Sequence, residues 1–271
     1  MILSRIGNKS KIAMDIQKYF PEHRNYVEMF FGAGGMFFNK PIALHNVCND
    51  LDNDVYNLFK VLRENKEQLI DTLIKTPIHQ SLFKDWYKNK EQDPIWKAVR
   101  FLVLSNFSLL GKSDTLSFSQ SHTKKVLLEK IDETFIQIQN VRFMNCDFRN
   151  VIPQLAFRSN RPNQRLFTFI YADPPYLGTT SNYDLPKWTD DDANDLIEIC
   201  KNTDLKMAIS EFDNPKILEI AKGLNVYQIG ERKNLKNRRN EILITNYEVK
   251  EGREKRKEKD LTAGTLFETP N

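Results

Sequence analysis

The stretch Tyr171-Ala172-Asp173-Pro174-Pro175-Tyr176 follows an apolar run, 166–171, that is rich in aromatic and β-branched residues. Such a run, ending at proline, predicts a buried β-strand. Each proline fixes its own φ and lacks a backbone N–H, so the chain can neither continue the sheet nor enter a helix here. The Asp173 carboxylate and the Pro174 carbonyl are then neighbouring acceptors, and the Tyr176 ring can lie flat against a planar guest. We therefore take Asp173, Pro174, Pro175 and Tyr176 as candidate catalytic residues around a primary amine on an aromatic ring; a strand-ending turn with a solvated aspartate is the alternative.

Glycines and acids follow the other strand signals. A strand beginning at Asn25 runs into the turn Gly32-Ala33-Gly34-Gly35, where glycines permit positive φ and close approach to a ligand. Asp50 ends the next short strand, where an acid holds ribose hydroxyls in Rossmann-like folds. A third strand, 141–146, ends in Asp147-Phe148, which could contact a bound adenosine through the carboxylate and the ring. A helix N-cap is the alternative for Asp147.

Basic residues precede an amphipathic pattern at the beginning of the chain. Arg5, Lys9 and Lys11 stand before or in the first turn of a helix predicted from Ile12 to Phe20. Positive charge there opposes the helix dipole, which indicates an anionic partner. A solvated basic terminus is the alternative.

Several helices are predicted between the second and third strands. Residues 55–75 read as one helix with Asp52 at its N-cap, and further helices follow near 82–87 and after Asp93-Pro94. The segment 105–125 is dense in hydroxyls, amides and lysines, which suits a polar hairpin that contacts phosphates and base edges. An ordinary solvated loop is the alternative. Its candidate DNA-binding residues are Asn106, Lys112, Ser113, Ser119, His122, Lys124 and Lys125.

The remainder of the chain returns to alternating elements. Thr189 is predicted to cap a helix over 190–201, and strands are predicted over 206–210, 224–229 and 242–248. The segment 231–241 between the last two strands reads as a cationic loop. Lys236, Arg238 and Arg239 are its candidate phosphate contacts.

Composition narrows the class of protein. The 271 residues carry a formal net charge of +4 and contain no run of eighteen apolar residues, so we expect no membrane span. The N-terminus lacks a signal-peptide pattern, which predicts a cytoplasmic protein. Cys48, Cys146 and Cys200 are unclustered and read as reduced core residues, and the four histidines lack metal-ligand spacing, so no metal is expected.

Taken in order, these motifs resemble those of Dam-type DNA adenine (N6) methyltransferases, in which the cofactor motif precedes the catalytic motif and the recognition domain lies between them. The resemblance covers residues 4 to about 248 and is carried by Gly7-Asn8-Lys9, the run 26–34, Asn49-Asp50, Cys146-Asp147-Phe148 and Asp173-Pro174-Pro175-Tyr176. It implies an α/β, Rossmann-like methyltransferase fold with a mostly parallel, doubly wound sheet and an inserted, mainly helical DNA-recognition subdomain with a polar hairpin. The implied division is a catalytic domain over 1–55 and 141–249, a target-recognition domain over 56–140 and a charged tail over 250–271.

The resemblance also implies a function, site-specific transfer of a methyl group from S-adenosylmethionine to N6 of a flipped-out adenine in duplex DNA, with S-adenosylhomocysteine as product and no metal. The implied cofactor-binding residues are Arg5, Gly7, Lys9, Glu28, Phe30, Phe31, Gly32, Ala33, Gly34, Gly35, Asp50, Asp147, Phe148 and Asp173. Arg5 stands where relatives can have an aromatic residue. The segment 109–113 does not reproduce the hairpin of the member that reads GATC, so that specificity is not carried over.

We expect a bacterial or phage-encoded protein, associated with the nucleoid through DNA, monomeric or weakly dimeric, and of the kind found in restriction-modification. The alternatives are methylation of cytosine N4, of an RNA base or of a protein glutamine, and a catalytically silent DNA-binding protein on the same fold.

Overall fold

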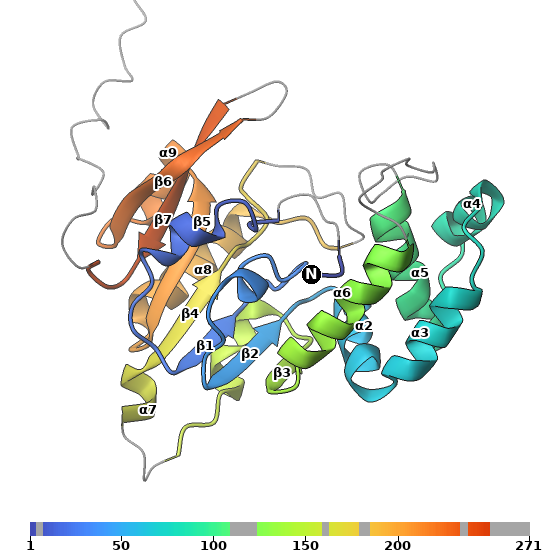
Figure 1. The fold of residues 1–271 in the computed structure, drawn as a ribbon. Helices are drawn as coiled ribbons and strands as arrows, with labels where there is room; N and C mark the ends of the chain where they lie inside the picture. Colours follow the sequence, from blue (N-terminus) through green and yellow to red (C-terminus); the bar gives the residue numbers. More distant parts are fainter. Residues whose placement is uncertain (4–7, 109–123, 159–162, 179–184, 234–237, 250–271) are drawn as a thin grey trace, which may run out of the picture.

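A seven-stranded sheet forms the centre of the molecule in the computed structural model, which describes residues 1–3, 8–108, 124–158, 163–178, 185–233 and 238–249 (Figure 1). The strand order is β3-β2-β1-β4-β5-β7-β6. Neighbouring strands among β1 to β5 pair in parallel, and β7 is antiparallel to both β5 and β6. This arrangement confirms the predicted mostly parallel, doubly wound α/β fold. The strands are β1 (Asn25–Glu28), β2 (His45–Asn49), β3 (Val141–Met144), β4 (Thr168–Ala172), β5 (Lys206–Phe212), β6 (Asn225–Lys233) and β7 (Arg238–Thr245).

The sheet reverses its winding at β1. Asn25 of β1 is in register with His45 of β2 on one side and with Thr168 of β4 on the other. The chain therefore proceeds outward to β3 in one direction and to β5 in the other. The carboxyl ends of β1 and β4 meet at this switch point, which is where open α/β sheets bind their ligands.

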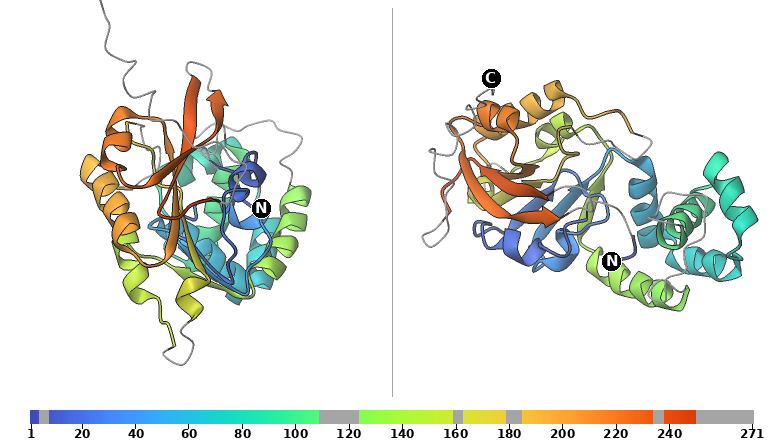
Figure 2. Two further views of the ribbon diagram at one scale, coloured as in Figure 1. Left: turned by 90° about the vertical axis from the view of Figure 1, so that its left-hand side faces the viewer. Right: turned by 90° about the horizontal axis from the view of Figure 1, so that it is seen from above.

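Two apolar cores cover the two faces of the sheet. Figure 2 (left) shows the strands between α8 and α9 on one side and α1 with the cluster of helices on the other. One core holds Tyr26, Phe59, Phe169 and Tyr171, and the other holds Ile170, Leu196, Ile209 and Ile217. Strand residues thus alternate between the two cores, as the period of two requires. The helices are α1 (Ala13–Gln17), α2 (Asn53–Glu64), α3 (Lys66–Lys75), α4 (Gln80–Lys88), α5 (Pro94–Phe107), α6 (Lys124–Gln137), α7 (Asn163–Leu166), α8 (Asp190–Asn202) and α9 (Pro215–Ile220), with 3₁₀ turns η1 (Phe37–Asn39), η3 (Phe148–Asn150) and η4 (Ile152–Gln154).

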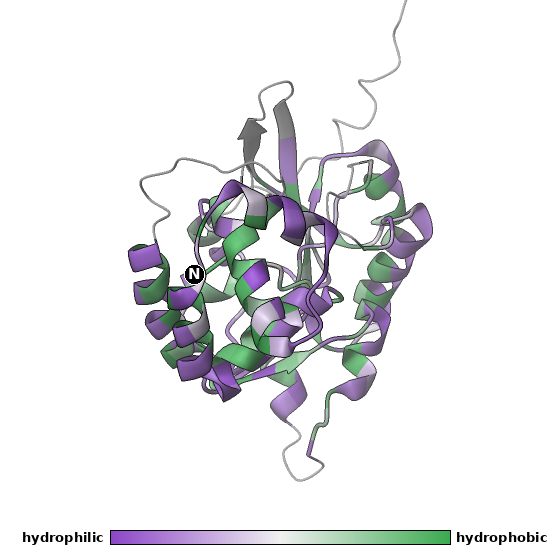
Figure 3. Cartoon of the chain, turned by 90° about the vertical axis from the view of Figure 1, so that its right-hand side faces the viewer, coloured by the Kyte–Doolittle hydropathy of each residue, from purple (hydrophilic) through white to green (hydrophobic). Residues whose placement is uncertain are grey.

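Helices α2 to α6 form a cluster beside β3 (Figure 1). Many of their apolar residues, among them Leu62, Leu73 and Leu102, are buried and join the core on the α1 face of the sheet. The same helices carry hydrophilic as well as hydrophobic bands in Figure 3, the pattern of helices that bury one face. None of the helices in the described ranges is long and apolar enough to cross a membrane.

Side-chain caps begin several helices where the sequence predicts them. Asp52 accepts from the Asp54 amide at 2.9 Å, and Asp93 accepts from the Ile95 and Trp96 amides at 3.0 and 2.9 Å. Thr189 and Asp192 form a capping box at the start of α8, which confirms the predicted cap.

Four predicted elements differ from the structure. The single helix expected over 55–75 is broken at Asn65, which ends α2 with φ −142° and begins α3. The first helix ends at Gln17 rather than at Phe20. The segment 105–125, expected as a loop, begins and ends in helix, because α5 continues to Phe107 and α6 begins at Lys124; residues 109–123, on which the predicted hairpin falls, lie outside the described residues. The expected cationic loop 231–241 is mostly strand, since β6 runs to Lys233 and β7 begins at Arg238.

Candidate active site

The carboxyl ends of β1 and β4 lie side by side at the switch point. Glu28, the last residue of β1, is in register with Tyr171, and the Met29 amide donates to the Tyr171 carbonyl at 3.0 Å. The chain leaves β1 through the glycine turn 32–35 and leaves β4 through the segment 173–176. These two segments therefore lie at the same edge of the sheet, where open α/β sheets have their ligand-binding crevice.

The glycine turn has a backbone conformation in which other residues would be strained. Gly32 and Gly34 have φ of +54° and +74°, in the left-handed region. A Cβ on Gly35 would overlap Oδ1 of Asn8, because the N-terminal segment packs directly on the turn. The Gly32 amide donates to Asp50 Oδ2 at 2.5 Å, which joins the turn to the end of β2.

Asn49 and Asp50 hold three strand ends together. The Asn49 side-chain amide donates to the carbonyls of Met29 and Cys146, each at 3.0 Å, so it connects the segments after β1 and β3. Asp50 Oδ1 accepts from the Asp52 amide at 2.8 Å. The predicted position of Asp50 at a strand end is confirmed, and its carboxylate is half-buried beside the glycine turn.

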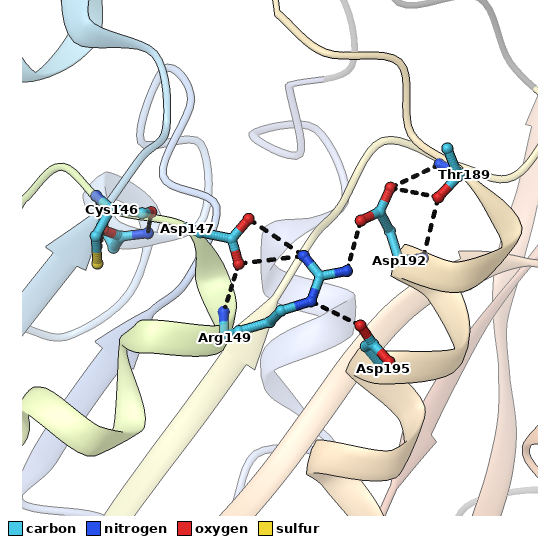
Figure 4. Close-up of polar contacts among 7 residues, drawn as sticks. Cys146, Asp147, Arg149, Thr189, Asp192 and Asp195 are labelled. Carbon is cyan, nitrogen blue, oxygen red and sulfur yellow. Dashed lines mark hydrogen bonds and ion pairs between the residues drawn. The ribbon is translucent and has the colours of Figure 1, made fainter.

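Asp147 follows β3 and is fixed by Arg149, as Figure 4 shows. Its Oδ1 accepts from the Arg149 amide at 2.9 Å, so the N-cap role weighed from the sequence is present. The Arg149 guanidinium lies 3.2 Å from Asp147, 2.6 Å from Asp192 Oδ1 and 2.6 Å from Asp195 Oδ2. It thereby ties the end of β3 to the first turns of α8.

Three aromatic side chains gather beside this cluster. The ring centroids of Phe30 and Phe148 are 5.5 Å apart, and the Trp188 ring lies 5.6 Å from Phe30 and 5.4 Å from Phe148. Phe148 is buried, whereas Phe30 and Trp188 are half-buried. The segment before α8 therefore returns to the crevice, next to the residues that end β1 and β3.

Asp173 lies at the head of a small ionic cluster. Its Oδ1 is 3.1 Å from Lys9 Nζ, and its side chain is 19% exposed. Lys9 Nζ also lies 2.5 Å from Glu241 Oε1 and donates to the Tyr176 hydroxyl, which in turn donates to Glu241 at 2.5 Å. Burial raises the pKa of the Asp173 carboxyl; Lys9 opposes this shift and the nearby Glu241 adds to it.

Tyr176 and Leu177 connect the same segment to β5. The Tyr176 ring meets Phe212 edge-on, with centroids 4.4 Å apart. The Leu177 amide donates to Glu211 Oε1 at 2.8 Å, while Glu211 Oε2 is buried and has no hydrogen-bond partner among the described residues. Burial raises the pKa of Glu211 to about 8. Glu211 also lines a small apolar cavity under Pro174 and Trp188.

Glu28, one of the predicted cofactor-binding residues, is buried. Its side chain is 2% exposed and accepts from the Tyr26 hydroxyl at 2.7 Å. Burial raises the pKa of Glu28 to about 8 and lowers the pKa of the nearby Lys40 to about 8. In this structure Glu28 is thus enclosed next to the Tyr26 hydroxyl.

The predicted DNA-binding positions, together with Arg5 and Gly7, fall into three groups. Arg5, Gly7, Lys112, Ser113, Ser119, His122 and Lys236 lie outside the described residues. Arg238 and Arg239 belong to β7. Of the others, Asn106 donates to the carbonyls of Ile2 and Leu102, Lys124 donates to those of Ile74 and Thr76, and Lys125 is exposed.

Sequence reasoning missed Arg149, Glu211 and Glu241. Each contacts a predicted motif or the residue next to one in the folded structure, but no sequence pattern marks any of the three as functional. Cys48 and Cys200 are buried and Cys146 is half-buried, all as free thiols. Across the ranges that the structure describes, no group of His, Cys, Asp and Glu side chains could hold a metal ion.

Comparison with known proteins adds a family match. The family model described as D12 class N6 adenine-specific DNA methyltransferase matches residues 6–237. The type II methyltransferase M1.LlaDCHI of Lactococcus lactis subsp. cremoris is 23% identical, over 89% of this chain and 93% of its own. The DNA adenine methylase of Vibrio cholerae is 25% identical, over 75% of this chain and 76% of its own. A solved Streptococcus pyogenes structure, described as a conserved hypothetical protein, has a TM-score of 0.36 at 9% identity, over 89% of this chain and 95% of its own.

Proposed function

The chain belongs to the D12 class of N6 adenine-specific DNA methyltransferases, and we propose that the crevice between the glycine turn and Asp173 is its active site. The chain is accordingly an enzyme that methylates the N6 amine of adenine in DNA, and membership of the family implies that it uses S-adenosylmethionine. The observation that carries the site assignment is Asp173, 19% exposed and paired with Lys9 at the switch point.

The residues around the crevice fit S-adenosylmethionine. Asp50 offers a carboxylate beside the glycine turn for the ribose hydroxyls, and Asp147 with Phe148 offers a carboxylate and a ring for the adenine moiety. Phe30, Phe31, Ala33, Gly34 and Gly35 would form the surrounding wall, with Lys9 and Asp173 at the end nearest the reaction. When bound, this cofactor supplies an activated methyl group on a sulfonium with a neutral leaving group.

Asp173 and the Pro174 carbonyl would bind the amine to be methylated. Adenine's exocyclic amine is a poor nucleophile, because its lone pair is delocalised into the ring. Each of the two acceptors takes one N–H, which favours a tetrahedral nitrogen whose lone pair points at the methyl group. Positive charge develops on that nitrogen in the transition state, and the fixed Asp173 carboxylate stabilises it.

The target adenine must leave the duplex to reach this pocket. Extrusion of a base costs a few kcal/mol, on the order of what stacking on an aromatic ring returns. Tyr176 is the candidate ring, held by its hydroxyl to Lys9 and Glu241. We propose that residues 56–140 read the target and that Lys125, Lys236, Arg238 and Arg239 contact phosphates.

The test is labelled methyl transfer with duplex DNA, RNA and protein offered in parallel, followed by identification of the modified base. We expect N6-methyladenine in DNA alone; label in cytosine, RNA or glutamine would favour another amino-methyltransferase. Asp173→Ala is expected to abolish transfer while binding of S-adenosylmethionine and DNA persists. Near wild-type turnover of Asp173→Ala would contradict the site assignment.

A further inference from the structure

Glu241 reaches the crevice because of the direction of its strand. It is in register with Phe212, the last residue of β5, and β7 runs antiparallel to β5. The amino-terminal half of β7 is therefore the part that comes to the edge of the sheet where Asp173 lies. The Glu241 side chain is 2% exposed, and its Oε1 lies 2.5 Å from both Lys9 Nζ and the Tyr176 hydroxyl.

Glu241 and Asp173 share one ammonium group. Lys9 Nζ is 2.5 Å from Glu241 and 3.1 Å from Asp173, so it lies closer to the inner carboxylate. The Asp173 side chain is 19% exposed, whereas those of Lys9 and Glu241 are 3% and 2% exposed. A substrate can therefore reach only one of the two carboxylates.

Fold stability alone gives little reason to keep this arrangement. Apolar residues of similar volume often replace a buried ion pair without loss of stability, although removal of one partner is costly. The electrostatics of amine methylation gives a stronger reason. A lysine paired with Asp173 alone would cancel the charge that faces the amine, whereas with a second carboxylate the ionised cluster keeps one net negative charge.

We infer that Glu241 is a positioning residue for methyl transfer, which draws the Lys9 ammonium away from Asp173 and so preserves the negative charge that faces the target amine. The inference rests on the proposed function, because it requires Asp173 to contact that amine. Glu241 acts through Lys9 and touches neither substrate nor cofactor.

Glu241→Gln keeps the shape of the side chain and removes its charge, so that Lys9 then pairs with Asp173 alone. We expect single-turnover methylation at saturating cofactor and DNA to slow by about 100-fold, the lower end of the effect of removing one electrostatic group aimed at the transition state, with the two dissociation constants unchanged. Glu219→Gln makes the same chemical change in an exposed surface pair with Lys222, and it is expected to leave the rate unchanged.

A double variant separates this role from a structural one. Lys9→Met combined with Glu241→Gln leaves Asp173 as the one carboxylate of the cluster, and it carries a negative charge at a pH above its raised pKa, where the variants are compared. We expect it to turn over faster than Glu241→Gln alone once cofactor is saturating. A structural role predicts the reverse order, because two buried contacts are lost instead of one. Glu241→Asp keeps the negative charge, so it should lose less activity than Glu241→Gln, and this comparison remains informative if Glu241→Gln folds poorly. An equal loss of activity in the two variants contradicts the inference.

Assaying Asp173→Ala beside these variants distinguishes a wrong active-site assignment from a wrong role for Glu241. Wild-type turnover of Asp173→Ala would overturn the proposed active site, and with it the inference. If Asp173→Ala is inactive but Glu241→Gln keeps the wild-type rate, or the double variant is no faster than Glu241→Gln, the inference about Glu241 alone is wrong.

Discussion

Arg149 Nη2 lies 2.6 Å from Asp192 Oδ1, so that a residue just after β3 is bound to the first turn of α8. The same guanidinium contacts Asp147 and Asp195, and it stacks on the Phe148 ring at 4.4 Å from the centroid. Both residues proposed to hold the cofactor's adenine moiety are therefore oriented by one side chain. Its planar fork suits this geometry in a way that a lysine does not.

Arg149→Ala should weaken cofactor binding more than it weakens the fold. Asp147 would lose the group that orients its carboxylate, and we expect the dissociation constant for S-adenosylmethionine to rise by about tenfold, the effect typical of a removed supporting contact. The cluster is partly exposed, so its loss should cost only about 1 kcal/mol of unfolding free energy. Titration calorimetry and thermal melting measure the two effects, and Arg149→Lys should be intermediate in affinity. An unchanged affinity in Arg149→Ala would mean that Asp147 needs no support.

Tyr176 has a ring and a hydroxyl whose contributions can be separated. Tyr176→Ala removes the surface proposed for the extruded base, and we expect kcat/KM to fall by about 10- to 100-fold, as for loss of one stacked base. Tyr176→Phe keeps the ring against Phe212 and loses the hydrogen bonds that the hydroxyl makes with Glu241 and Lys9. It should cost less than Ala in steady-state methylation of a duplex substrate. If Phe is as damaging as Ala, the hydroxyl contributes and stacking is an incomplete account.

The strand ends of the crevice were predictable because each is marked locally. Asp50, Asp147 and Asp173 all follow predicted strands, and parallel strands bring their carboxyl ends to one edge. The glycine content of residues 32–35 predicts a turn with positive φ, and Gly32 and Gly34 do have positive φ. The meeting of these residues at one edge of the sheet could therefore be predicted from the strand pattern and from the rule that parallel strands end at the same edge.

Glu241 was not predictable in the same way. The sequence predicts a cationic, phosphate-binding loop over 231–241, but β6 and β7 extend into it, and the antiparallel direction of β7 brings Glu241 to the crevice. Strand direction depends on pairing with distant residues, and no local pattern reports it. The break at Asn65 was missed for a related reason, since the apolar spacing continues on both sides of it and Leu62 and Leu69 are both buried.

Glu211 should make the stability of the protein fall as pH rises. Burial raises its pKa from 4.5 to about 8, so the native state favours the protonated carboxyl while the unfolded chain ionises at its ordinary pKa. Stability is therefore lost between those two pH values, with a slope of at most about 1.4 kcal/mol per pH unit from this group. Glu211→Gln keeps an acceptor for the Leu177 amide and cannot ionise.

Urea unfolding of both proteins at several pH values within that range isolates the contribution of Glu211. The free energy of unfolding of Glu211→Gln, relative to wild type, should rise as pH increases. A difference that stays constant with pH would show that Glu211 ionises in the native state as easily as in the unfolded chain.

Lys124 and Lys125 are neighbours with different surroundings, which makes them a matched pair for testing phosphate contacts. Lys124 donates to the carbonyls of Ile74 and Thr76 at the C-terminal end of α3, whereas Lys125 is exposed on the first turn of α6. A cation at a helix C-terminus contributes about 0.3–1 kcal/mol. Lys124→Ala should therefore lower the free energy of unfolding by about that amount and leave the salt dependence of DNA binding unchanged.

Lys125→Ala should keep wild-type stability but make the slope of log K against log salt shallower by about 0.9, the value for one lost phosphate contact. Fluorescence anisotropy with a labelled duplex over a salt series measures both slopes, and a shallower slope in Lys124→Ala would mean that its ammonium leaves α3 to bind DNA.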